Sequence, residues 1–250
     1  MCRMLGIVSK IETEKEIFEN FRQQCLTGCV KSTHKEPGHN DGWGLAFLKN
    51  GEMEVVKSGK DAKGDKLFDE TYPLAANSPV LVGHIRKATD PKTKGVAEFA
   101  HPFDKEGWVF AHNGSVFWTD EMKSPYPDLI DSQIVLEVVL AKIRGEQNIF
   151  GKVKEAVLEI IEKEPLSSLN FLLTNGKSFI CCMFFDDSDP ENKRYYTLYQ
   201  KVEKNRIMVA SEPVDGKSDG WQLLESGQLL MIEPDLKVKR ETLDFQKISR

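Results

Sequence analysis

The sequence predicts an α+β fold in which two mainly antiparallel sheets pack against each other. Short apolar runs of strand length occur along most of the chain, and turn signals such as Asn50-Gly51 separate them. Two amphipathic helical segments lie near the middle of the chain. The 250 residues can bury a substantial core without a repeat or a clear linker, so we expect residues 1–250 to form a single domain.

The strands are predicted from these apolar runs, and the helices from apolar residues with a period near 3.6. Asn50-Gly51 indicates a hairpin, and Asn175-Gly176-Lys177 marks a turn between two other strands. The predicted strands span residues 4–9, 42–49, 52–58, 80–85, 108–112, 170–174, 178–185, 194–200, 206–211 and 228–233. Helices are predicted over 11–25, 131–144 and 152–163, and long loops, which are often functional, over 27–41, 90–106 and 119–130.

The charge and hydropathy of the chain argue against nucleic-acid and membrane partners. The net charge of −5 and the pI of about 5.7 offer no basic surface to either. No apolar run reaches the roughly 18 residues of a membrane helix, and the N-terminus lacks a secretory signal pattern. We expect a cytoplasmic protein that acts on a small-molecule substrate.

The five cysteines predict neither a disulfide framework nor a metal site. Their count is odd, and the expected compartment is reducing. Cys25 and Cys29 could suggest a metal, but no second cysteine or histidine pair has matching spacing. No phosphate-binding loop or cofactor motif occurs. We therefore expect no metal and no cofactor.

Cys2 is the strongest candidate for chemistry because it directly follows Met1. Aminopeptidases remove an initiator methionine that precedes a small residue, and Cys2 would then carry both a thiol and a free α-amine. The unperturbed pKa is about 8.5 for a thiol and about 7.7–8.0 for an α-amine, so the amine can take the proton of the thiol. The alternative is an ordinary small residue at the start of a buried strand.

Asn113-Gly114 follows an apolar run and allows two interpretations. The first is a tight turn. The second is an oxyanion hole, in which the Asn113 side-chain amide and the Gly114 backbone N–H donate to the oxyanion of an acyl-transfer intermediate.

Two charged residues could recognise the head group of an amino acid. Arg86 ends an apolar run, and a guanidinium can hold a carboxylate through two parallel hydrogen bonds. Asp131 begins a predicted helix, and its carboxylate could pair with an ammonium group. The alternatives are a solvated or salt-bridged Arg86 and a helix N-cap at Asp131.

Together with further short motifs, these residues resemble the glutaminase domain of class II glutamine amidotransferases, which are N-terminal nucleophile (Ntn) hydrolases. Each motif alone is weak, but the set follows the family's order over nearly the whole chain. The motifs are Cys2, Asp41-Gly42-Trp43-Gly44-Leu45-Ala46, His84-Ile85-Arg86-Lys87-Ala88-Thr89, His101-Pro102-Phe103, His112-Asn113-Gly114, Asp131-Ser132, Ala210-Ser211-Glu212-Pro213 and Gly227-Gln228. The resemblance implies a four-layer αββα sandwich.

The resemblance also implies a role for each matching residue. Cys2 would be the nucleophile and its α-amine the general base, with Asn113 and Gly114 as the oxyanion hole. The thiolate would attack the γ-amide of glutamine or of a γ-glutamyl compound, and water would hydrolyse the γ-glutamyl thioester. The substrate-binding residues would be Arg86 and Thr89 for the α-carboxylate and Asp131 for the α-ammonium.

The sequence departs from the larger, synthase-linked members at the rim of the implied pocket. Lys87 and Asp90 stand where those members usually have tryptophan and histidine, and Gln133 replaces an acid. We expect no synthase domain, and the sequence is similar to short stand-alone members, some of which cleave γ-glutamyl amides or peptides. The sequence leaves open whether the protein has a synthase partner or another ammonia acceptor. Two other functions also stay open, namely an acylase of the same superfamily acting on another amide, and a catalytically silent regulatory or binding subunit.

Overall fold

The computed structural model describes residues 2–32, 38–217 and 219–243, whose strands form two antiparallel sheets. The seven-stranded sheet has the order β11-β9-β10-β1-β4-β2-β3, and the six-stranded sheet has the order β13-β12-β8-β7-β6-β5. The first contains β1 (Arg3–Ser9), β2 (Trp43–Lys49), β3 (Glu52–Ser58), β4 (Val80–Ile85), β9 (Tyr199–Glu203), β10 (Arg206–Ala210) and β11 (Trp221–Leu223). The second contains β5 (Phe103–Lys105), β6 (Trp108–Val116), β7 (Leu166–Thr174), β8 (Phe179–Met183), β12 (Gln228–Ile232) and β13 (Val238–Thr242).

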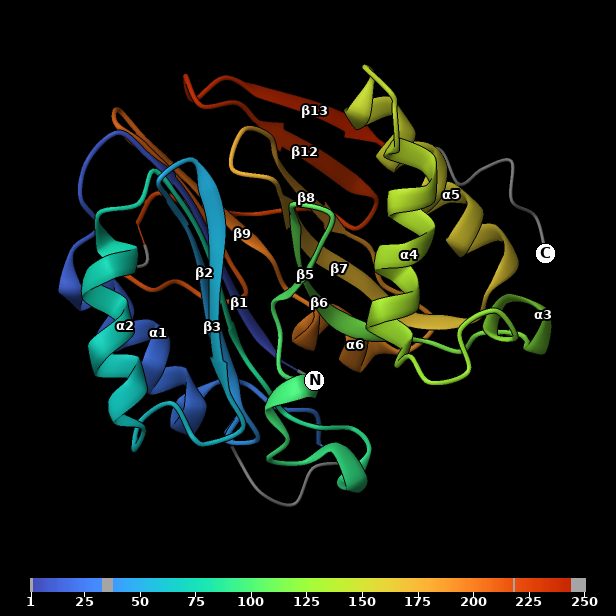
Figure 1. Ribbon diagram of the computed structural model, residues 1–250, viewed down its shortest axis with the longest axis horizontal. Helices are drawn as coiled ribbons and strands as arrows, with labels where there is room; N and C mark the ends of the chain where they lie inside the picture. Colours follow the sequence, from blue (N-terminus) through green and yellow to red (C-terminus); the bar gives the residue numbers. More distant parts are fainter. Residues whose placement is uncertain (1, 33–37, 218, 244–250) are drawn as a thin grey trace.

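Helices cover the outer face of each sheet and produce the expected four-layer αββα sandwich (Figure 1). Helices α1 (Lys15–Thr27) and α2 (Lys66–Ala76) pack on the seven-stranded sheet. Helices α4 (Asp131–Ile143) and α5 (Ile149–Lys163) pack on the six-stranded sheet. The shorter helices are α3 (Asp120–Lys123), α6 (Pro190–Tyr195), η1 (Pro91–Thr93) and η2 (Ala97–Phe99).

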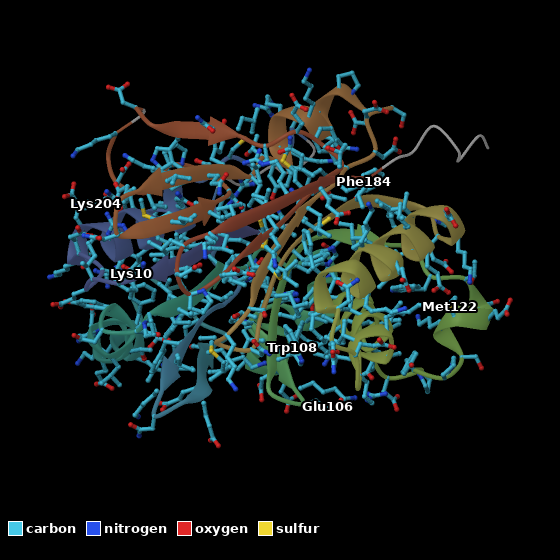
Figure 2. The ribbon with its side chains drawn as sticks, turned by 90° about the horizontal axis from the view of Figure 1, so that it is seen from above. Lys10, Glu106, Trp108, Met122, Phe184 and Lys204 are labelled. Carbon is cyan, nitrogen blue, oxygen red and sulfur yellow. The ribbon has the colours of Figure 1, made fainter. Side chains whose placement is uncertain are left out.

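Buried apolar side chains pack between the layers, and Figure 2 shows how densely side chains occupy the space between the ribbons. The layer between the sheets is especially tight at Gly6, where an added Cβ would lie 2.2 Å from Cζ of Phe179. Because β1 of one sheet and β8 of the other each contribute a residue to this contact, the glycine permits the close approach of the two sheets.

The arrangement of three strands brings distant motifs together at one end of the sandwich. Strand β1 lies between β10 and β4, so that Leu5 pairs with Ala210 on one side and with Gly83 on the other. Residue Cys2, just before β1, is therefore next to the residues that follow β4. Strand β6 of the six-stranded sheet lies opposite Cys2 at this end of the sandwich, since Asn113 in β6 contacts Cys2.

Most of the predicted elements are confirmed, including the hairpin at Asn50-Gly51, where both residues have positive φ. The strand predicted over 194–200 is wrong, since α6 occupies its beginning and β9 starts only at Tyr199. The Asp189 side chain caps that helix and Pro190 fits its first turn. The loops predicted over 90–106 and 119–130 contain η1, η2, β5 and α3, while residues 33–37 of the loop 27–41 lie outside the described part.

Candidate active site

Cys2 is buried at the end of the seven-stranded sheet, with its backbone nitrogen directed at the six-stranded sheet. The nitrogen donates to Oδ1 of Asn113 at 2.8 Å. The thiol lies 3.9 Å from the backbone oxygen of Lys87, and its relative exposure is 6%. The next residues are fixed by the end of β10, since Met4 N donates to Oγ of Ser211 at 3.0 Å and Arg3 forms an ion pair with Glu212 at 3.0 Å.

Asn113 and Gly114 lie within β6, so their interpretation as a tight turn is wrong. Their partners in β7 are Asn170 and Leu169. The orientation of the Asn113 amide follows from its contact with Cys2, because Oδ1 accepts a hydrogen bond and Nδ2 must therefore be the donor end. Nδ2 is buried and has no hydrogen-bond partner among the described residues. A buried, unsatisfied donor beside a thiol is suited to stabilise an oxyanion.

Gly114 has no room for a side chain. A Cβ at this position would lie 1.9 Å from the backbone oxygen of Ser168, and 2.9 Å from Nε2 of His112. Gly44 is restricted in the same way, because its Cβ would lie 2.4 Å from the backbone oxygen of His101. The glycine in β2 thus permits a close backbone approach between β2 and the segment at His101.

Arg86 follows β4 and is buried, with 6% relative exposure. Its backbone donates to Gly42 O at 2.8 Å. Its guanidinium donates to the backbone oxygen and to Oγ1 of Thr93, each at 2.6 Å. This excludes a solvated surface position and fixes the plane of the guanidinium in the pocket wall.

Asp131 is the first residue of α4, whereas Ile130 occupies the N-cap position. The N-cap interpretation of Asp131 is therefore wrong, and its carboxylate accepts from Val116 N at 3.2 Å instead. Gln133 supplies the capping contact by accepting from Ile130 N at 3.1 Å. Asp131 thus keeps a carboxylate at the pocket, bonded to the end of β6.

The surroundings of Cys2 favour its thiolate. Burial raises the pKa of the Cys2 thiol, but the positive charge of the N-terminus and then His84 lower it to a net value of about 5. By contrast, burial raises the pKa of Cys181 to about 12. Burial also holds the pKa of His101 well below its usual value, helped by the neighbouring His84. Because a thiolate is the reactive form of cysteine, these pKa directions favour Cys2 over Cys181 as a reactive thiol.

Cys2, Arg86 and Asp131 line the same pocket, which has a volume of about 310 Å³. Five of the predicted site residues line it, and Asn113 reaches it through its contact with Cys2. Cys2, Arg86, Thr89, Gly114 and Asp131 are the predicted lining residues, joined by Lys87, Asp90, Thr93, His101, His112, Ser115, Val116, Phe117, Ile130 and Ser132.

The family is decided by the sequence. A family model described as class-II glutamine amidotransferases matches residues 1–189. The chain belongs to the class II glutamine amidotransferases. Two relatives are similar to this chain over most of its length. The "Putative glutamine amidotransferase" of Haemophilus influenzae is 28% identical, with 95% of this chain and 86% of the relative covered. An uncharacterized protein of Methanocaldococcus jannaschii is 29% identical, with 93% and 69% covered.

Solved structures of amidotransferases share the fold of this class II glutamine amidotransferase. The glutamine phosphoribosylpyrophosphate amidotransferase of Bacillus subtilis has a TM-score of 0.68 at 18% identity, covering 98% of this chain. This chain spans only 50% of that one. A glutamine aminotransferase class-II domain protein from Silicibacter pomeroyi has a TM-score of 0.59 at 16% identity, with 97% of this chain and 100% of the other covered.

Sequence reasoning misses several pocket residues of this class II glutamine amidotransferase. Thr93 lies in a segment predicted as a loop, and nothing in the sequence signals its two contacts with Arg86. His101 by itself has the sequence context of a structural residue, yet it lines the pocket, and neither of its ring nitrogens has a partner among the described residues. His112 lies beside Asn113 in the sequence, and its Nδ1 lies 2.9 Å from Oγ of Ser132.

The described residues contain neither a metal-binding group of side chains nor a helix that could span a membrane. Among residues 2–32, 38–217 and 219–243, no group of three or more histidine, cysteine or acidic side chains is placed to hold a metal ion. Over the same residues, every helix is too short or too polar to cross a membrane.

Proposed function

We propose that this chain is an amidohydrolase with Cys2 as an N-terminal nucleophile, acting in the cytoplasm on the γ-amide of glutamine or of a γ-glutamyl compound. The observation that carries the proposal is the contact between Cys2 N and Asn113 Oδ1 at 2.8 Å. The contact supports the proposal because the nitrogen that would become the α-amine lies beside the Asn113 amide, whose Nδ2 is buried without a partner among the described residues, and because Cys2 lines the pocket. Removal of Met1 is part of the proposal.

The first half-reaction makes a thioester. Once Met1 is removed, the proton of the Cys2 thiol passes to the α-amine of the same residue. Sγ attacks the γ-carboxamide carbon, and Asn113 Nδ2 and the Gly114 backbone N–H donate to the resulting oxyanion. The α-ammonium of Cys2 then gives its proton to the leaving nitrogen. The C–N bond breaks, and ammonia or an amine leaves.

The second half-reaction returns the enzyme to its starting state. A water molecule gives one proton to the α-amine of Cys2 and attacks the thioester carbon. The C–S bond breaks, the thiolate takes the proton back from the α-ammonium, and glutamate is released after its γ-carboxyl group loses a proton to water. A synthase partner or another ammonia acceptor would use the first product, and the proposed chemistry needs no cofactor.

Recognition of the glutamyl head group is assigned to two charged side chains that line the pocket. The Arg86 guanidinium, with help from Thr89, binds the α-carboxylate, and the Asp131 carboxylate binds the α-ammonium. This pair of charges favours a zwitterionic substrate over the amides of an acylase. The buried thiolate and amide donor favour an enzyme over a silent subunit.

The test is the intact mass of the purified protein before and after 6-diazo-5-oxo-L-norleucine, a glutamine analogue with a diazoketone. The diazo carbon would take a proton from the α-ammonium of Cys2, and the Cys2 thiolate would then form an S–CH₂ bond while dinitrogen leaves. We expect loss of Met1 and one adduct, located on Cys2. Retained Met1 would contradict the mechanism, and processed but unlabelled protein would contradict glutamyl recognition.

A further inference from the structure

We propose that Thr93 is a positioning residue that holds the Arg86 guanidinium in the orientation needed for the substrate carboxylate. The inference rests on the proposed function, since it assigns Arg86 to the α-carboxylate. Thr93 belongs to none of the motifs that identify the family in this sequence, and its role is argued from its contacts.

Thr93 contacts Arg86 through two oxygens at once. Its backbone oxygen accepts from Nη1 and its Oγ1 accepts from Nη2, both at 2.6 Å. The hydroxyl hydrogen is directed elsewhere, because Oγ1 donates to the backbone oxygen of Asp90 at 2.9 Å. The lone pairs of Oγ1 therefore face Arg86, and the hydroxyl links the guanidinium to the loop that ends at Thr93.

The two contacts use one N–H from each terminal nitrogen of the guanidinium and thereby fix its plane. Within the part of the chain that the structure describes, the guanidinium makes no other hydrogen bond, so its remaining N–H groups can meet an anion in the pocket, which Arg86 and Thr93 both line. Thr93 is itself buried, with 8% relative exposure. A carboxylate would thus meet an oriented guanidinium, and little side-chain entropy would be lost on binding.

In addition to the contact between Thr93 and Arg86, Asp41 holds the loop between these two residues. The Asp41 carboxylate accepts from Ala88 N at 2.9 Å, and it pairs with Lys94 Nζ at 3.3 Å. One contact lies near each end of the loop, which carries Thr89 in the pocket wall. Because the backbone of this loop has its own support, loss of the Thr93 hydroxyl should release mainly the guanidinium.

The experiment compares two alkylating reagents on the full-length, processed protein. 6-Diazo-5-oxo-L-norleucine carries an α-carboxylate and iodoacetamide does not, and both form a thioether with the Cys2 thiolate. Thr93→Val, Thr93→Ala and Thr93→Ser are compared with the parent protein. Thr71→Val serves as the control, because its buried hydroxyl also bonds a backbone oxygen, that of Leu67, but lies on α2 outside the pocket.

For Thr93→Val and Thr93→Ala we expect a half-saturating concentration of the diazoketone about tenfold higher, the effect of losing a hydrogen bond to a charged group. The maximal rate of labelling and the rate with iodoacetamide should stay within about twofold, because neither depends on the carboxylate. Thr93→Ser should behave as the parent, and so should Thr71→Val.

Two results would overturn the inference. One is an unchanged half-saturating concentration in both Thr93→Val and Thr93→Ala. The other is an equal loss of reactivity toward both reagents, which would indicate general disruption of the site. Failure of the proposed function is recognised separately, since the parent protein would then not be labelled by the diazoketone at all.

Discussion

Cys2 and Asn113 are joined by a 2.8 Å hydrogen bond that crosses from one sheet to the other. Cys2 directly precedes β1 of the seven-stranded sheet, and Asn113 lies within β6 of the six-stranded sheet. The thiol and the amide donor therefore come from different layers. Their alignment depends on how the two sheets pack.

Replacement of Cys2 by serine should abolish labelling by the glutamine analogue and lower any glutaminase turnover by about 10³-fold or more, because the nucleophile is removed. Cys29→Ser is the matched control, since Cys29 is a free, half-buried thiol. Mass spectrometry and ammonia release measure the two effects. Full turnover in Cys2→Ser would contradict the mechanism.

Asn113→Asp should lower kcat by about 10²–10³-fold and leave KM nearly unchanged. The carboxylate can still accept from the Cys2 nitrogen, but it has no N–H for the oxyanion. Steady-state kinetics separates the two constants. A rise in KM with an unchanged kcat would argue for substrate binding by Asn113 instead.

In the chain that retains Met1, the reaction of Cys2 with iodoacetamide should lose half its rate near pH 5. The folded thiol has a pKa of about 5, below the usual value, so the thiolate is present above pH 5 and is lost as the pH falls through it. Because His84 contributes to this lowering, His84→Gln should move the midpoint upward. Labelling rates across pH 4–9 test this, and a midpoint near the ordinary value of about 8.5 would contradict it.

Asp131→Asn should raise KM for glutamine about tenfold or more, because the neutral amide cannot pair with the α-ammonium. Its side-chain oxygen can still accept from Val116 N, so the end of β6 should be retained. Glutaramate, which is glutamine without its α-amine, provides the control substrate. The parent and Asp131→Asn should differ little with glutaramate, and an equal defect with both substrates would refute the assignment.

Gly114→Ala should destabilise the protein by about 1–3 kcal/mol, because its Cβ would lie 1.9 Å from a backbone oxygen that cannot move freely. Gly64→Ala is the control, since nothing lies within 4 Å of the Cβ at that position. Urea unfolding measures both changes. Equal stability of the two variants would show that β6 and β7 can separate without cost.

Local sequence signals predict the parts of the fold that depend on local chemistry. Asn50-Gly51 supplies the positive φ values of a hairpin, and the apolar period of α4 and α5 matches their buried faces. Helix α2 escapes prediction, since Pro73 lies inside it, although the side chain of Asp65 caps its N-terminus.

The errors at the site arise from tertiary contacts. Asn113-Gly114 has the composition of a turn, yet pairing with β7 extends β6 to Val116. Asp131 has the residue type of an N-cap, but its carboxylate bonds across to Val116 instead. The contact of Thr93 with Arg86 depends on how the segment after β4 folds back, and short-range patterns carry no information about that.

The contact between Gly6 and Phe179 limits which substitutions this protein can accept during evolution. Gly6 and Phe179 set the approach of two layers that hold opposite halves of the pocket. A larger residue at Gly6 would push the layers apart and move the thiol away from the amide donor. This would happen although no pocket residue is substituted. Loss of activity in natural variants should therefore map to this inner layer as well as to the pocket, and second substitutions that restore the spacing should restore turnover.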